Sequence, residues 1–193
     1  SIDLDILPGT VHAVIGPNGA GKTTLFNVIS RVIEPSEGTV TFAGDDLLRR
    51  RPSDLIGMGI TRTFQNLQLF GLSSVYENIS GALIHRFRGG LVAAVGKRGR
   101  RHNEEVRDRV LQTAELLGIK NRLASYPASL PYGILKRVEL ARALVSEPRL
   151  VLLDEPAAGL NSDETADLID IFARVAETGV TMVLVEHDMN VVM

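Results

Sequence analysis

Gly16-Pro17-Asn18-Gly19-Ala20-Gly21-Lys22-Thr23 is a glycine-rich stretch that fits the pattern G-x-x-x-x-G-K-[ST]. A short apolar, β-branched run at 11–15 precedes it, and apolar residues at helical spacing follow it over 22–32. The predicted order is therefore strand, glycine loop, helix. Glycines let successive backbone N–H groups curl around phosphate oxygens, and the helix N-terminus adds a partial positive charge. A chance glycine turn is the alternative, which the flanking pattern disfavours.

The side chains of this loop predict a nucleotide site with divided roles. Lys22 would carry a full positive charge to the β- and γ-phosphates, and the Thr23 hydroxyl would ligate Mg²⁺. Thr24 can add a further hydroxyl contact. The predicted nucleotide-binding residues are Gly16, Pro17, Asn18, Gly19, Ala20, Gly21, Lys22, Thr23 and Thr24.

An acidic pair, Asp154 and Glu155, follows a second apolar strand at 150–153. Ligands of a parallel sheet bind at the carboxyl ends of its strands, where the glycine loop also lies. Adjacent strand residues point in opposite directions, so the two carboxylates should differ in role. We expect Asp154 to hold Mg²⁺ through water and Glu155 to polarise the attacking water as a general base. The alternative is an acidic pair that faces solvent.

The remaining patterns predict an α/β fold with a mostly parallel sheet. A third buried strand is expected at 180–185, after a helix that is capped by Ser162 and ends at Gly179. The residues that this helix should bury are Leu168, Ile169, Phe172 and Val175. Short strand patterns also occur at 39–42, before a glycine turn, and at the start of the chain, where the alternating apolar residues are Ile2, Leu4 and Ile6.

Residues 75–147 predict a helical lobe inserted between two strand–helix halves. One helix is expected over 103–117, with Val106, Val110, Ala114 and Leu117 on one face. A second is expected from Gly133 to the residues before Pro148.

Composition excludes several classes of function. The 193 residues carry 21 Lys+Arg and 23 Asp+Glu, a net charge of −2, so no nucleic-acid partner is expected from bulk charge. The absence of cysteine excludes disulfide scaffolds, thiolate zinc sites and cysteine nucleophiles. No apolar run reaches the roughly 18–20 residues of a membrane span.

Further motifs, in order after the glycine loop, resemble those of an ATP-binding-cassette (ABC) ATPase. They are Thr61-Arg62-Thr63-Phe64-Gln65, Leu130-Pro131-Tyr132-Gly133, the acidic strand 150–155, Ala158-Gly159-Leu160-Asn161 and Glu186-His187-Asp188. The phrases TRTFQNLQLFGLSSVYENI, LPYGILKRVELARAL and LLDEPAAGLN are most similar to the ATP-binding subunits of branched-chain amino-acid importers. The resemblance implies a P-loop NTPase fold: a RecA-like core at 1–74 and 148–193, a small antiparallel β part and the helical lobe. The chain would be one ATP-binding domain over 1–193, truncated at both ends.

The resemblance also implies roles for single residues. Gln65 would sense Mg²⁺ and the attacking water and link to the permease, and His187 would contact the γ-phosphate. A turn made of Gly159, Leu160 and Asn161 would touch the opposing subunit. The implied catalytic residues are Lys22, Gln65, Glu155 and His187, and the implied metal ligands are Thr23, Gln65 and Asp154.

Two departures from the family pattern stand out. The signature L-S-G-G-Q reads Leu130-Pro131-Tyr132-Gly133-Ile134 here, so the serine hydroxyl that would bind the other subunit's ATP is absent. Backbone N–H groups at Gly133 could still bind that phosphate, or Pro131 and Tyr132 merely start a helix. The family usually stacks adenine on an aromatic side chain upstream of the glycine loop, but the first aromatic residue of this chain is Phe26, which follows the loop. Weaker ATP binding is therefore expected.

The resemblance implies an ATPase subunit that energises the import of a small solute and uses ATP and Mg²⁺. Its partners would be a second ATP-binding subunit in a homo- or heterodimer, transmembrane permease subunits and, indirectly, a solute-binding protein, at the cytoplasmic face of the plasma (inner) membrane. The alternatives are a soluble ABC ATPase of DNA repair or translation and a nucleotide-binding module without turnover. The basic, glycine-rich stretch 86–101 is either a solvated loop or a contact with anionic lipid or an acidic partner.

Overall fold

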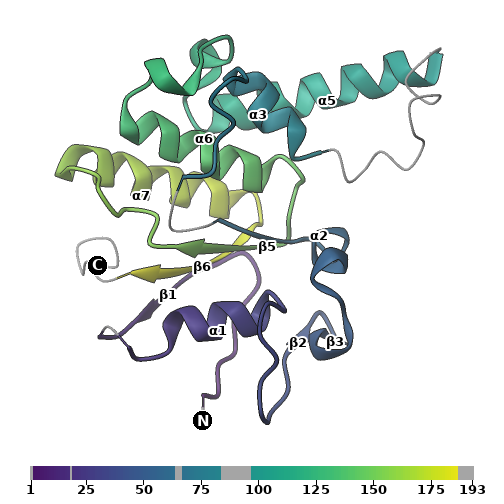
Figure 1. Ribbon diagram of the computed structural model, residues 1–193, viewed down its shortest axis with the longest axis vertical. Coiled ribbons are helices and arrows are strands. Elements are labelled where there is room, and N and C mark those ends of the chain that lie inside the picture. Colours follow the sequence, from purple (N-terminus) through teal and green to yellow (C-terminus); the bar gives the residue numbers. More distant parts are fainter. Residues whose placement is uncertain (1, 18, 64–66, 84–96, 187–193) are drawn as a thin grey trace. The chain divides into compact units, whose positions relative to one another are not determined.

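The computed structural model describes residues 2–17, 19–63, 67–83 and 97–186, with the backbone alone for 97–102. The chain divides into two compact units (Figure 1), residues 1–65 together with 148–193, and residues 66–147.

A four-stranded parallel sheet organises the first unit, in the order β1-β6-β5-β4. Its strands are β1 (Val11–Ile15), β4 (Ile60–Arg62), β5 (Leu150–Asp154) and β6 (Thr181–Glu186). The register places Ile15 beside Glu186, and Asp154 beside Val185. The carboxyl ends of the strands therefore meet at one edge, which confirms the predicted parallel α/β sheet.

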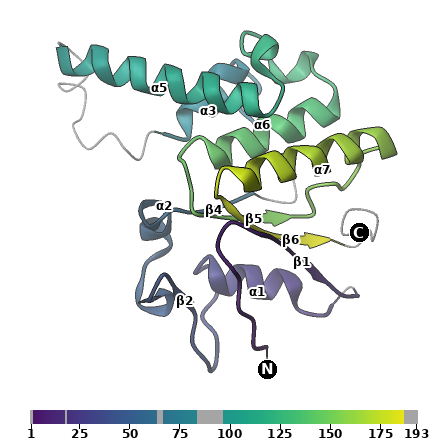
Figure 2. The same cartoon turned by 180° about the vertical axis from the view of Figure 1, so that it is seen from behind.

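Helices cover both faces of this sheet (Figures 1 and 2). Helix α1 (Lys22–Ile29) packs Phe26 and Ile29 against one face; the sheet residues of this cluster are Ile60, Leu150, Leu152, Val183 and Val185. Sheet residues of the opposite parity, such as Val151 and Met182, are fully buried on the other face. Helix α7 (Ser162–Glu177) lies on that side of the sheet. Burial on both faces explains why β5 and β6 are almost continuously apolar.

The alternating residues at the start of the chain do not form the predicted strand. Residues 2–7 have no strand assignment, and Ile2 and Leu4 are exposed. Alternation favours an extended backbone, but a strand also needs a hydrogen-bonded neighbour, and no described strand pairs with this segment.

A small hairpin and three short helical turns connect α1 to β4. Strands β2 (Thr41–Phe42) and β3 (Asp45–Asp46) pair antiparallel around Ala43 and Gly44. The φ angles of these two residues are 52° and 85°, as a two-residue hairpin turn requires. The turns η1 (Leu47–Arg49), η2 (Pro52–Asp54) and α2 (Leu55–Met58) follow. The predicted antiparallel part is confirmed, although its first strand is shorter than the pattern at 39–42.

Helix α1 ends at Ile29, earlier than the apolar pattern at 22–32 predicted. The Arg31 N–H donates to Val28 O (3.1 Å) and the Val32 N–H to Asn27 O (2.8 Å). Arg31 has a φ of 60°, so these two bonds form a Schellman ending. Because arginine stands where glycine is usual, no glycine marked this stop in the sequence.

Two details of α7 differ from the prediction. The buried face is Leu168, Ile171, Phe172 and Val175, whereas Ile169 is exposed. The cap is Asn161 and not Ser162: the Glu164 N–H donates to Asn161 Oδ1 (2.9 Å), and the Asn161 N–H donates to Glu164 Oε2 (3.1 Å). This reciprocal capping box satisfies two N–H groups, which a cap one residue later could not do with Glu164.

We expect Asn161→Ala to lower the free energy of unfolding by about 1 kcal/mol, because it removes the accepting side chain of this cap. Ser162→Ala is the matched control and should change it by less than about 0.5 kcal/mol. Urea unfolding of both variants measures the difference. A larger loss of unfolding free energy in Ser162→Ala than in Asn161→Ala would contradict the assignment of Asn161 as the cap of α7.

In the described part of the second unit, α3 (Val75–Gly81), α5 (Lys97–Leu116) and α6 (Tyr132–Leu144) pack on one another. The turns η4 (Lys120–Arg122) and η5 (Pro127–Ser129) lie between α5 and α6. Of the four residues predicted on one helix face, Val110, Ala114 and Leu117 are fully buried, whereas Val106 is only partly buried.

A capping box also starts helix α3. The Ser74 N–H donates to Glu77 Oε2 (2.6 Å), and the Glu77 N–H donates to Ser74 Oγ (3.2 Å). The backbone and side-chain hydrogen bonds from Ser74 lower the pKa of Glu77.

The prediction of a loop over 86–101 is wrong for its last part, because helix α5 already begins at Lys97. Residues 86–96 of that stretch lie outside the described residues.

Candidate functional site

The glycine loop joins β1 to α1 at the carboxyl edge of the sheet. Gly19 and Gly21 have φ angles of 82° and 88°, which glycine adopts far more readily than any other residue. Gly21 is the N-cap of α1, and no described side chain caps this helix. Its first N–H groups are therefore directed at the loop, where an anion would be stabilised.

Lys22 is buried at the base of this loop, with 8% of its surface exposed. Its ammonium donates to two loop carbonyls, Gly16 O (2.5 Å) and Pro17 O (2.9 Å). Among the described residues it forms no ion pair, so its positive charge is not neutralised by a carboxylate. Thr23 and Thr24 follow it in the first turn of α1 and are exposed. This arrangement can accept a phosphate.

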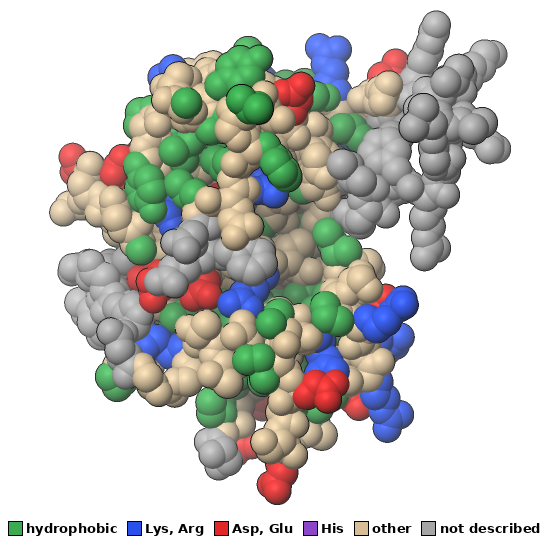
Figure 3. All heavy atoms as spheres, in the orientation of Figure 1, with side chains coloured by type: hydrophobic (Ala, Val, Ile, Leu, Met, Phe, Trp, Pro, Cys, Tyr) green, Lys and Arg blue, Asp and Glu red, His purple; other side chains and the backbone are tan. Residues whose placement is uncertain are grey.

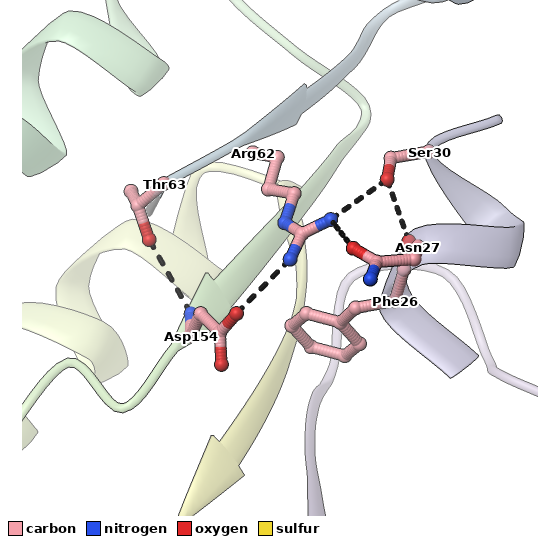
Figure 4. A network of polar contacts seen from close by, with 6 residues as sticks. All are labelled: Phe26, Asn27, Ser30, Arg62, Thr63 and Asp154. Carbon is pink, nitrogen blue, oxygen red and sulfur yellow. Dashed lines mark hydrogen bonds and ion pairs between the residues drawn. The ribbon is translucent and has the colours of Figure 1, made fainter. Parts of the chain in front are cut away.

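The predicted metal residue Asp154 is the last residue of β5 and is ion-paired with Arg62 of β4 (Figure 4). Arg62 Nη2 donates to Asp154 Oδ2 at 3.0 Å. The same guanidinium reaches α1, where Nη1 donates to Asn27 Oδ1 (2.7 Å) and to Ser30 Oγ (2.9 Å). The sequence assigned no role to Arg62. The available signal was a charged residue in a short strand that ends at the sheet edge bearing the acidic pair.

Glu155 stands at the first position after β5, in a strained backbone conformation. Its φ is 48°, in the left-handed region that disfavours side chains other than glycine. Its N–H still donates to Val185 O (3.0 Å), so the ladder to β6 continues through this residue. Asp154 is buried, whereas Glu155 is only partly buried. The two carboxylates therefore occupy different environments, although Glu155 lies just beyond the strand within which the predicted alternation applies.

A buried carboxylate holds the turn after the acidic pair. Glu186, the last residue of β6, has 4% of its surface exposed, and its Oε1 accepts the Ala157 N–H at 2.9 Å. The turn continues through Gly159 (φ 81°) to Asn161, which caps α7. Glu186 appeared in the sequence only as part of a motif, and its link to Ala157 was not foreseen. Gly159, Leu160 and Asn161 stay a predicted subunit contact.

The signature segment begins helix α6 in the second unit. Pro131 is the N-cap, no described side chain caps the helix, and Tyr132 and Gly133 lie in the first turn. Leu130 precedes them with extended backbone. The ring of Tyr132 is 41% exposed, and Lys136 Nζ lies 5.8 Å from its centre. This geometry is compatible both with phosphate binding at a helix start and with a plain helix start.

Three predicted site residues lie outside the described residues: Asn18, Gln65 and His187. Their roles stay predictions.

The donor set at the sheet edge fits Mg²⁺ that arrives with a nucleotide. Asp154 offers carboxylate oxygens and Thr23 a hydroxyl, the hard ligands that Mg²⁺ prefers. Within the part of the chain that the structure describes, no group of three or more His, Cys, Asp or Glu residues could hold a metal ion. Mg²⁺ here would need substrate phosphates and waters to complete its six ligands, as is usual for this ion.

Comparison with known proteins agrees with this geometry. Residues 1–158 match the family model described as "ABC transporter". The chain is 36% identical to the high-affinity branched-chain amino acid transport ATP-binding protein LivG of Escherichia coli (strain K12), over 196 aligned residues, all of this chain and 77% of that protein.

Solved structures give the same result. The ADP conformation of an ATP-binding cassette of an ABC transporter superposes with a TM-score of 0.82 at 29% identity, and the match covers 99% of this chain and 75% of that one. A dimeric, post-hydrolysis ATP-binding cassette bound to ADP and phosphate has a TM-score of 0.78 at 30% identity, over 97% of this chain and 79% of that one.

Proposed function

The chain belongs to the ABC transporter family, whose ATP-binding subunits are ATPases, and from this premise we propose that it energises the import of branched-chain amino acids. The observation that carries the ATPase part is the glycine loop, with a buried Lys22 that forms no ion pair within the described part of the chain, on the same sheet edge as Asp154 and Glu155. The substrate class comes from the similarity to LivG. The two alternatives, a non-transport ABC ATPase and a module without turnover, are not favoured by these relatives.

The proposed chemistry is phosphoryl transfer from ATP to water. The loop N–H groups and Lys22 bind the β- and γ-phosphates and neutralise their charge. Glu155 accepts a proton from the attacking water, and Gln65 and His187 position that water and the γ-phosphate. Thr23, Gln65 and Asp154 would hold Mg²⁺, which, when bound, neutralises charge that develops on the phosphate oxygens.

We propose a dimer of two ATP-binding subunits as the active state, in which the segment Leu130, Pro131, Tyr132 and Gly133 completes the partner's ATP site. The dimeric relative bound to ADP and phosphate supports this arrangement. The uncapped start of α6 supplies free N–H groups for the phosphate, even without the usual serine.

The permease partner is supported by exposed apolar side chains of the second unit. Hydrophobic side chains gather on its surface in the view of Figure 3. Among the residues of this unit whose side chains the structure describes, the exposed large hydrophobic ones are Phe70, Leu72, Tyr126 and Tyr132. Asn78, fully buried, fixes the segment before α3: its Nδ2 donates to Phe70 O (3.0 Å), and its Oδ1 accepts the Phe70 N–H (2.8 Å). A rigid apolar segment of this kind suits a protein partner.

No described helix is long and apolar enough to cross a membrane. We propose a peripheral location at the cytoplasmic face of the plasma (inner) membrane, where permease subunits would hold the chain. A solute-binding protein would contribute only indirectly, and no nucleic-acid partner is proposed.

Lys22→Ala tests the ATPase part. Each hydrogen bond to a charged group contributes about 1.5–3 kcal/mol, so we expect ATP affinity to fall by about 10- to 150-fold. Lys120→Ala is the matched control, because Lys120 is exposed and its ion pair with Glu115 lies at the surface. Calorimetry with MgATP and phosphate release measure both variants. A native chain that neither binds MgATP nor releases phosphate would overturn the proposal.

The transport part needs the complete system. Proteoliposomes that contain the chain and its permease subunits should take up leucine only with ATP, and Lys22→Ala should abolish that uptake. ATP hydrolysis without any uptake of branched-chain amino acids would limit the proposal to an ATPase of another transporter.

A further inference from the structure

Arg62 binds the carboxylate that the proposed function places at Mg²⁺. We infer that Arg62 is a positioning residue for the magnesium-dependent step: it holds Asp154 in one orientation and ties it to α1, the helix that begins with Lys22. The inference rests on the proposed function, because it needs a nucleotide that brings Mg²⁺ to Asp154.

The guanidinium of Arg62 contacts Asp154, residues of α1 and the C-cap of that helix (Figure 4). Nη2 donates to Asp154 Oδ2 (3.0 Å), while Nη1 is shared between Asn27 Oδ1 (2.7 Å) and Ser30 Oγ (2.9 Å). The guanidinium carbon also lies 5.8 Å from the centre of the Phe26 ring. A planar fork can satisfy acceptors on two elements in one fixed orientation, whereas a lysine ammonium is a point charge without that geometry.

Burial of this pair indicates that it sets geometry more than it adds stability. The side chains of Arg62 and Asp154 are 11% and 8% exposed. At such sites the cost of removing two charges from water offsets much of their attraction, so the pair contributes little net stability. Its effect is to fix one oxygen of the carboxylate. Within the described residues, Oδ1 of Asp154 accepts no side-chain hydrogen bond and can face a metal-bound water.

The position of Arg62 in the sheet connects the parts of the proposed site. Arg62 is the last residue of β4 and lies beside Leu152 in the register, two positions before Asp154. The next residue, Thr63, reinforces this junction: its N–H donates to Leu152 O (2.9 Å), and its Oγ1 accepts the Asp154 N–H (3.4 Å). Movement of Asp154 relative to α1 would break bonds at Arg62. Removal of a hydrogen-bond partner of a metal ligand typically lowers metal affinity or activity by about 10–100-fold.

Arg62→Lys is the test variant, because it keeps the charge and loses the fork. The measurement is ATP affinity, by calorimetry or with a fluorescent ATP analogue, once with excess Mg²⁺ and once in EDTA. We expect the gain in affinity that Mg²⁺ provides to shrink about tenfold, while affinity in EDTA stays within about twofold, because the glycine loop and Lys22 are intact. The turnover number should fall by about 10–100-fold. Arg50→Lys is the matched control, since Arg50 pairs with Asp45 at the surface.

A second variant keeps the inference falsifiable if Arg62→Lys does not fold. Asn27→Ala combined with Ser30→Ala leaves the pair with Asp154 but removes the tie to α1, and should weaken the magnesium dependence in the same direction. Equal losses of ATP affinity with Mg²⁺ and in EDTA, or an unchanged ATP affinity in both conditions, would overturn the positioning role of Arg62. A native chain that binds no nucleotide at all would instead contradict the proposed function.

Discussion

Glu155→Gln is expected to keep MgATP affinity within about twofold and to lower the turnover number by about 10²–10⁴-fold, the range that general-base catalysis provides. The substitution is nearly isosteric, and glutamine branches as glutamate does, so the strain at φ 48° is the same in both chains. The substitution removes the negative charge of the carboxylate and, with it, the ability to accept a proton. If ATP holds the proposed dimer together and hydrolysis separates it, a variant that does not hydrolyse ATP should also accumulate as a dimer.

Phosphate release at saturating MgATP measures turnover, calorimetry measures affinity, and analytical ultracentrifugation measures the dimer. The control is Glu37→Gln, which changes an exposed glutamate of the same unit and should alter none of the three. Unaltered turnover in Glu155→Gln would remove Glu155 from its proposed role.

Phe26→Ala should lower the free energy of unfolding by about 3–5 kcal/mol, the range for truncation of a buried aromatic side chain. Phe26 is fully buried between α1 and the sheet, where it contacts the cluster that includes Leu152 and Val183. The loss also includes its contact with the Arg62 guanidinium. Urea unfolding measures the change.

Phe70→Ala is the matched control, because Phe70 is 62% exposed and its ring contacts the guanidinium of Arg142. Its cost should stay below about 1 kcal/mol, the value of an exposed cation–π contact. Similar losses of unfolding free energy in Phe26→Ala and Phe70→Ala would show that α1 does not pack on the sheet as described.

The buried strands and the loop between β1 and α1 were predictable because each of these features has a local signal. The runs of four consecutive apolar residues at 150–153 and 182–185 indicate strands buried on both faces, and a glycine pattern between a strand and a helix has one common structural meaning. The end of α1 was not predictable in the same way, since Arg31 adopts a left-handed conformation that no residue type announces. The cap of α7 was misplaced by one residue, because Asn161 and Ser162 are both good caps and only the pairing with Glu164 decides between them.

Within the candidate site, the sequence identified charged residues but not their partners. Asp154 was assigned to a metal from its place at a strand end. Its ion pair with Arg62 joins positions 92 residues apart, and only the order of β4 beside β5 brings them together. The bond between Glu186 and Ala157 depends on strand order in the same way. Contacts of this kind follow from sheet topology, which local patterns do not encode.

The left-handed backbone at Glu155 has a consequence for engineering. Such a conformation costs a non-glycine residue about 1–3 kcal/mol, so glycine at this position would relax the turn after β5. Selection for thermal resistance alone would therefore favour discarding the carboxylate that the proposed hydrolysis requires. At this position, resistance to heat and enzymatic turnover make opposite demands on a single side chain.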